Sequence, residues 1–290
     1  MDTSEAERGA ADRRVRPLVC QIRRRPSNSR DRVRPIAAVI RWGKQLGKPV
    51  KSWQRQPLST GAKPRDTWGA MLYTLTRKVL GPVARLVYRP VIEGRENIPR
   101  TGPLILASNH LSFVDSIVIP LVAPRRVVFL AKSEYFSGSG IRGTLMRTLL
   151  TAVGAVPIER GTAGAAQEAL DSALAILKDG LAFGIYPEGT RSRDGRQYRG
   201  RTGVAWLALT AGCPVVPVAL SGTQDIQPVG SRIPRIRKIT VRFGKPLDFS
   251  YLQGAKPGLA RREATDAVMA AIHELSGQEQ VPRYNVPPQH

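Results

Sequence analysis

The sequence has few cysteines, few histidines and no long apolar run. Its 290 residues include 2 Cys and 3 His. Two cysteines cannot build a disulfide framework, and histidines this far apart do not favour a metal site, so we expect none. No run reaches the roughly 18 apolar residues of a membrane-spanning helix, and the arginine-rich start lacks the apolar core of a secretory signal. We therefore expect a peripheral protein on the cytoplasmic face of the cell membrane.

Acidic residues are also scarce. The chain has 45 Lys and Arg against 22 Asp and Glu, a net charge of +23, which calls for a nucleic acid, an anionic membrane or a phosphorylated substrate as partner. Residues 1–66 hold 17 of the basic residues and 6 of the acidic ones. This stretch lacks apolar periodicity, so it is predicted to be a disordered tail. The folded domain is expected over 67–278, followed by a polar tail over 279–290.

The first periodic segment covers residues 68–89. Its apolar residues recur at steps of three and four, and its Lys and Arg lie mostly off that stripe, which predicts an amphipathic basic helix. Such a helix suits the headgroup region of an anionic membrane surface. The alternative is a helix that simply packs on the domain.

After Pro90, short apolar runs alternate with helical windows, each bounded by turn residues. This alternation predicts an α/β fold with a mixed, largely parallel central sheet flanked by helices, preceded by the amphipathic helical segment. Strands are expected at 91–94, 103–108, 126–131, 154–159, 181–187, 214–220 and 236–244, and helices at 163–178, 201–211 and 258–275.

The stretch "SNHLSFVDS" places His110 and Asp115 directly after the strand 103–108. We expect Ser112 to cap a helix that begins near Phe113, and the carboxylate to fold back onto the imidazole. A carboxylate on one ring nitrogen leaves the other as a proton acceptor, as in a catalytic dyad. The alternative is an ordinary surface pair. No G-x-S-x-G motif occurs, so a nucleophile would be a substrate hydroxyl.

Cationic groups follow three other predicted strands. "YPEGTRSRDG" exposes a turn beside Glu188, Thr190 and Arg191, which suits an anion. Arg160 and Lys132 lie just past two further strands. Cations at the ends of different strands of one sheet could converge on a phosphate, and a guanidinium binds phosphate bidentately. The alternative is that they are solvated surface charges.

Four blocks together resemble the glycerolipid acyltransferases, in particular the 1-acylglycerol-3-phosphate acyltransferases: "NHLSFVD", "GAVPIERG", "YPEGTRS" and "CPVVPVAL". The resemblance covers roughly residues 70–250. It implies that His110 is the general base and Asp115 its orienting partner. It also implies that Arg160 and the turn Glu188-Gly189-Thr190-Arg191 bind the glycerol phosphate. Tyr186 stands where phenylalanine is usual, and "SEYF" after Lys132 departs from the family pattern and leaves the role of that lysine open.

The implied reaction moves a fatty acyl group from acyl-CoA or an acyl carrier protein to lysophosphatidic acid, making phosphatidic acid, with no resident cofactor. The runner-up acceptors are glycerol 3-phosphate and other lysophospholipids. The rival from another class is a basic nucleic-acid-binding protein. However, the basic segments carry no recognised binding module and no aromatic platform, so we expect no specific nucleic acid partner. The sequence does not indicate an oligomeric state.

Overall fold

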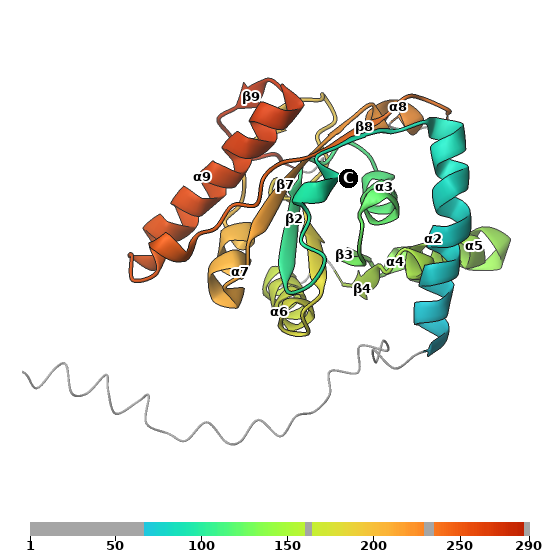
Figure 1. The fold of residues 1–290 in the computed structure, drawn as a ribbon, viewed down its shortest axis with the longest axis horizontal. Coiled ribbons are helices and arrows are strands. Elements are labelled where there is room, and N and C mark those ends of the chain that lie inside the picture. The colour runs from blue at the N-terminus through green and yellow to red at the C-terminus, as the bar shows by residue number, and fades with distance from the viewer. Residues whose placement is uncertain (1–66, 160–163, 229–234, 287–290) are drawn as a thin grey trace, which may run out of the picture. The chain divides into compact units, whose positions relative to one another are not determined.

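The computed structural model describes residues 67–159, 164–228 and 235–286 (Figure 1). The predicted tail over 1–66 lies outside the described residues. The domain is built on a seven-stranded sheet in the order β1-β8-β7-β2-β5-β3-β4. Its strands are β1 (Val91–Glu93), β2 (Leu104–Ser108), β3 (Val127–Lys132), β4 (Val156–Ile158), β5 (Ala182–Ile185), β7 (Val215–Ser221) and β8 (Thr240–Phe243).

Most of the sheet is parallel. β2 pairs in parallel with both β5 and β7, and β3 does so with β5 and β4, whereas β8 is antiparallel to β7 and parallel to β1. Central parallel strands are buried on both faces, which is why β2 and β7 read as continuous apolar runs. The predicted fold class is confirmed. As a consequence, β2, β3, β4, β5 and β7 all end at the same edge of the sheet.

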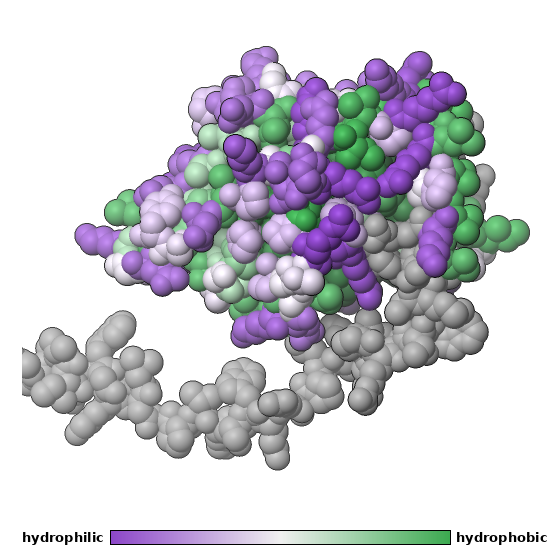
Figure 2. Space-filling view, in the orientation of Figure 1, coloured by the Kyte–Doolittle hydropathy of each residue, from purple (hydrophilic) through white to green (hydrophobic). Residues whose placement is uncertain are grey.

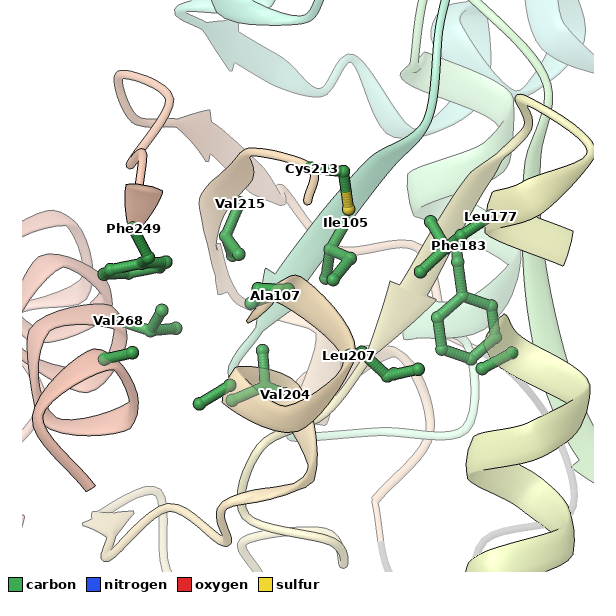
Figure 3. Packing of buried hydrophobic residues seen from close by; sticks show 14 of the residues in the cluster. Ile105, Ala107, Leu177, Phe183, Val204, Leu207, Cys213, Val215, Phe249 and Val268 are labelled. Carbon is green, nitrogen blue, oxygen red and sulfur yellow. The ribbon is translucent and has the colours of Figure 1, made fainter. Parts of the chain in front are cut away.

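Helices cover both faces (Figure 1). α6 (Ala165–Lys178), α7 (Gly203–Ala211) and α9 (Pro257–Ser276) pack on one face, and α3 (Asp115–Val122) packs on the other. Alternate residues of β2 serve the two faces: Ile105 and Ala107 point toward α7 and α9 (Figure 3), and Leu104 and Leu106 join the cluster that contains α3. Strand β2 therefore contributes side chains to the apolar core on both faces of the sheet.

A second group of helices lies beside α3. α2 (Thr67–Tyr88) confirms the predicted amphipathic helix and contacts α3 and α5 (Gly140–Ala152), which follows the short α4 (Glu134–Ser137). Sequence patterning missed α5, because "SGSGIRGT" resembles a loop. Gly143 is needed there: a Cβ would lie 2.1 Å from the carbonyl oxygen of Gly138. Leu150, on the inner side of α5, belongs to a small apolar cluster with Val153 and Phe113.

The segment expected to be a polar tail is part of the fold over 279–286. β9 (Gln280–Val281) pairs in parallel with β6 (Gln197–Tyr198), and the main-chain N–H of Arg199 donates to Arg283. The prediction was wrong here because hydrogen bonds, not apolar burial, hold this segment. Short elements complete the described chain: η1 (Arg95–Asn97), α8 (Thr223–Ile226) and η2 (Ser250–Leu252).

Candidate active site

His110 and Asp115 are in direct contact. Nδ1 of the imidazole lies 2.8 Å from Oδ2 of Asp115, and the main-chain N–H groups of Leu111 and Ser112 donate to the same oxygen at 2.7 and 2.8 Å. Asp115 is fully buried, and the His110 side chain is 16% exposed. A carboxylate oxygen accepts but cannot donate, so Nδ1 carries the proton in the neutral ring. Nε2 then holds a lone pair, and no described residue hydrogen bonds to it.

The turn before α3 differs from the predicted cap. The helix begins at Asp115, after Val114, and no described residue hydrogen bonds to Oγ of Ser112. Ser112 contributes its main-chain N–H instead, because the Asp115 carboxylate closes the turn from inside the helix. The same carboxylate therefore shapes the turn and holds the imidazole.

The loop after β5 lies against His110. The main-chain N–H of Ser192 donates to the carbonyl oxygen of His110 at 2.7 Å. The ring of Tyr186 stacks on the imidazole, with centroids 3.8 Å apart and planes 9° from parallel. β2 and β5 are neighbours in the sheet, so the two motifs that follow them meet at its carboxyl edge.

Glu188 faces inward from this loop. Its side chain is buried, and Oε2 accepts a hydrogen bond from the main-chain N–H of Tyr198 at 3.1 Å, while Oε1 has no partner among the described residues. Burial raises the pKa of the Glu188 carboxyl to about 7; the Tyr198 N–H opposes this rise, and nearby Asp194 adds to it. Glu188 therefore braces the loop, and its predicted contact with a substrate stays a prediction.

The other residues of the turn lie nearer the surface. Gly189 is exposed and has a φ of 79°, which favours glycine, and Thr190 is half-buried. Arg191 is exposed, has no carboxylate partner among the described residues, and accepts a hydrogen bond at its carbonyl oxygen from Nδ2 of Asn285 at 3.1 Å. The Arg191 guanidinium is thus available to an anion.

Lys132 and Arg160 are the two remaining cations that the sequence predicted for the site. Lys132 ends β3 at the same sheet edge and pairs with Glu134, Nζ to Oε1 2.7 Å, in an exposed ion pair. Arg160 lies outside the described residues. Within the described chain, no group of three or more His, Cys, Asp or Glu side chains could hold a metal ion.

Residues 89–221 match the family model described as Acyltransferase. This part of the chain is therefore similar to acyltransferases. It is 30% identical over 191 residues to a chloroplastic 1-acyl-sn-glycerol-3-phosphate acyltransferase of Brassica napus, covering 65% of this chain and 52% of that protein. It is 27% identical to the 1-acyl-sn-glycerol-3-phosphate acyltransferase of Bacillus subtilis, covering 64% and 88%.

A solved structure agrees with these relatives. The 1-acyl-sn-glycerophosphate acyltransferase PlsC of Thermotoga maritima superposes with a TM-score of 0.56 at 27% identity, covering 74% of this chain and 83% of that one. These similarities confirm the resemblance that the four blocks predicted. The chain spans about half the length of several of the curated relatives it matches.

The sequence did not reveal which hydrogen bonds connect the loops around His110. Buried Asn109, next to His110, accepts from the N–H of Leu220 at 2.8 Å and donates to the Leu220 carbonyl at 3.0 Å and to Oε1 of Gln278 at 2.8 Å. Gln278 in turn donates to the carbonyl oxygen of Gly195 at 2.6 Å. An amide beside a motif histidine was the only local signal, because the partners lie over 80 residues away.

Proposed function

We propose that this protein transfers a fatty acyl group from a thioester, acyl-CoA or acyl carrier protein, to the sn-2 hydroxyl of 1-acylglycerol 3-phosphate, and so makes phosphatidic acid. The observation that carries the proposal is the buried Asp115 carboxylate holding His110, with Nε2 unoccupied by any described side chain, directly beside the loop of Arg191. The names of the relatives support the same acceptor.

The chemistry follows from this arrangement. Nε2 of His110 takes the proton of the sn-2 hydroxyl as its oxygen attacks the thioester carbonyl, and the Asp115 carboxylate stabilises the imidazolium that forms. The tetrahedral oxyanion collapses, the carbon–sulfur bond breaks, and the imidazolium proton leaves with the thiolate. A positioned base of this kind contributes roughly 10²–10⁴-fold to the rate. The acyl group passes directly to the acceptor, with no acyl-enzyme.

The acceptor phosphate is assigned to the loop after β5. The Arg191 guanidinium offers a bidentate contact, and Thr190 and the N–H groups of the turn add neutral donors. Lys132 reaches the same edge after exchanging its exposed pairing with Glu134 for the phosphate. Arg160 completes the set implied by the sequence.

An acceptor panel tests the proposal. The full chain is given one labelled acyl thioester and, separately, 1-acylglycerol 3-phosphate, glycerol 3-phosphate and a lysophosphatidylcholine, and the products are separated by lipid class. Label in phosphatidic acid is expected, and His110→Ala should abolish it. His273→Ala is the histidine control, since that imidazole bonds to the main-chain carbonyl of Gln278 and, within the described residues, forms no hydrogen bond with His110 or Asp115. Full activity of His110→Ala, or transfer to another acceptor alone, would contradict the proposal.

The lipid acceptor also requires a membrane surface, and we assign it to α2 and α5. Exposed apolar side chains gather on these contacting helices, at the right-hand edge in Figure 2, and include Leu86 at 72%, Ile141 at 89% and Leu145 at 67% exposure. The two helices carry five Lys and Arg and no Asp or Glu. Exposed apolar side chains on helices that carry cations and no carboxylates suit an anionic bilayer surface. In the described residues no helix has the length and apolar character to span a membrane.

Flotation with vesicles of anionic lipid tests this surface. Ile141→Glu with Leu145→Glu should reduce the bound fraction at least several-fold, because each places a charge where an apolar side chain would enter the headgroup region. Leu259→Glu, at 68% exposure on α9, is the matched control. Equal binding by all variants would show that α5 is not part of the membrane-binding surface.

A further inference from the structure

Tyr186 contacts the candidate base through its ring and is held in place at its hydroxyl. Its ring lies parallel to the His110 imidazole at 3.8 Å, and its hydroxyl is 2.8 Å from Oγ of Ser116. On the same ring, Phe129 makes a second aromatic contact with centroids 5.4 Å apart. Contacts at both the hydroxyl and the ring thus fix the position of Tyr186, and one face of its ring stacks on the His110 imidazole.

The stack restricts a motion that the Asp115 bond leaves open. A hydrogen bond at Nδ1 fixes the distance between imidazole and carboxylate, but the ring can still turn about the Nδ1···Oδ2 line. Turning would move Nε2 away from an acceptor hydroxyl. A flat surface at 3.8 Å and 9° blocks that rotation, since any tilt of the ring would drive it into the tyrosine.

Ser116 connects the Tyr186 stack to the helix that also carries Asp115. It follows Asp115 in the first turn of α3, so neighbouring residues hold the imidazole, one directly and one through Tyr186. The bond between Ser116 and Tyr186 also ties this helix to the end of β5, which links the base to the loop of Arg191.

We propose that Tyr186, anchored by Ser116, is a positioning residue that sets the plane of the His110 ring and thereby the direction of Nε2. The proposal rests on His110 acting as the base. Tyr186 acts through His110 and touches no reacting atom, so its loss should lower kcat and leave KM for the acceptor unchanged.

Four variants test the proposal in the full chain. Tyr186→Leu removes the flat face and should lower kcat by about 10- to 100-fold, with KM unchanged, because a small misplacement of a reacting group costs this much. Tyr186→Phe keeps the face and should restore kcat to within about fivefold of the parent. Ser116→Ala should match Tyr186→Phe, and the two changes together should cost no more than one, because they remove the same bond.

The control is Phe249→Leu, a buried aromatic in the core on the other face of the sheet. It loses a comparable ring and should leave kcat within about twofold once the folded fraction is matched. A drop in kcat for Phe249→Leu equal to that for Tyr186→Leu would mean that general loosening explains both, and would overturn the proposal. A folded Tyr186→Leu with the kcat of the parent would overturn it as well.

A second readout does not depend on turnover. The chain has 3 histidines, so ¹⁵N-histidine spectra, assigned with His110→Ala, report the tautomer and mobility of this ring alone. A single Nδ1–H tautomer is expected in the parent and in Tyr186→Phe, and broadened or mixed signals in Tyr186→Leu. Unchanged signals in Tyr186→Leu would refute positioning. If the parent transferred no acyl group, the proposed function would fail, and the spectra would still decide the role of Tyr186.

Discussion

Replacing Asp115 by asparagine should separate the charge of the carboxylate from its geometry. The carboxylate oxygen Oδ2 accepts from His110 and from two main-chain N–H groups. An amide NH₂ cannot accept, so the asparagine oxygen must take this place, and the Nδ1–H tautomer of His110 is retained. Asp115→Asn therefore removes the negative charge and keeps the position of the ring.

The magnitude follows from the distance. At 2.8 Å and an effective dielectric constant of about 20, opposite unit charges attract by roughly 6 kcal/mol. In the proposed mechanism the imidazolium charge is only partly formed in the transition state, and the amide oxygen keeps a partial negative charge. We expect about half of this, roughly 3 kcal/mol, which corresponds to about 10²-fold in kcat.

Asp115→Ala is the contrasting change, because it leaves the N–H groups of Leu111 and Ser112 without an acceptor. Each orphaned donor costs about 1–3 kcal/mol, so the free energy of unfolding should fall by roughly 2–6 kcal/mol. Urea denaturation and steady-state kinetics distinguish the two variants: the asparagine variant should lose activity with little loss of stability, and the alanine variant should lose both. Wild-type kcat in Asp115→Asn would refute the role of the charge, and equal destabilisation of both variants would refute the orientation of the amide.

Three further predictions concern the loop after β5. Burial raises the pKa of Glu188 to about 7 from 4.5, so the folded state binds a proton more tightly. The free energy of unfolding should then fall by roughly 3 kcal/mol as pH rises from about 4.5 to about 7. Urea denaturation at pH 5 and 8 should show this slope largely absent in Glu188→Gln; an identical slope would contradict the assignment. Gly189→Ala strains a φ of 79° and places Cβ 2.9 Å from Nε of Arg201. It should lower stability by about 1–2 kcal/mol and raise KM for the acceptor; an unchanged melting temperature and KM would speak against it. Asn285→Ala removes the bond to the Arg191 carbonyl and should raise KM for the phosphorylated acceptor by about 2- to 10-fold at constant kcat; a change in kcat alone would argue otherwise.

Local patterns carried much of the fold and the centre of the site. Apolar runs such as "PLILAS" and "PVVPVAL" predicted β2 and β7, because buried parallel strands need apolar side chains on both faces. Alternation of strands and helices predicted the sheet and hence that His110, Lys132 and the Glu188 turn follow strands ending at one edge. The pairing of His110 with Asp115 was also readable, because both partners belong to one short turn.

What the sequence alone determined is therefore what neighbouring residues decide: which segments bury apolar area, and which turn carries the imidazole. Only the tertiary structure decided that β8 runs antiparallel to β7, that Tyr186 stacks on His110, and that the segment ending in Asn285 fastens the loop of Arg191. These contacts join polar and aromatic groups far apart along the chain. Hydrogen bonds and ring stacking at such separations follow no periodic spacing in the sequence. The contacts of these residues can therefore be identified only in the folded structure.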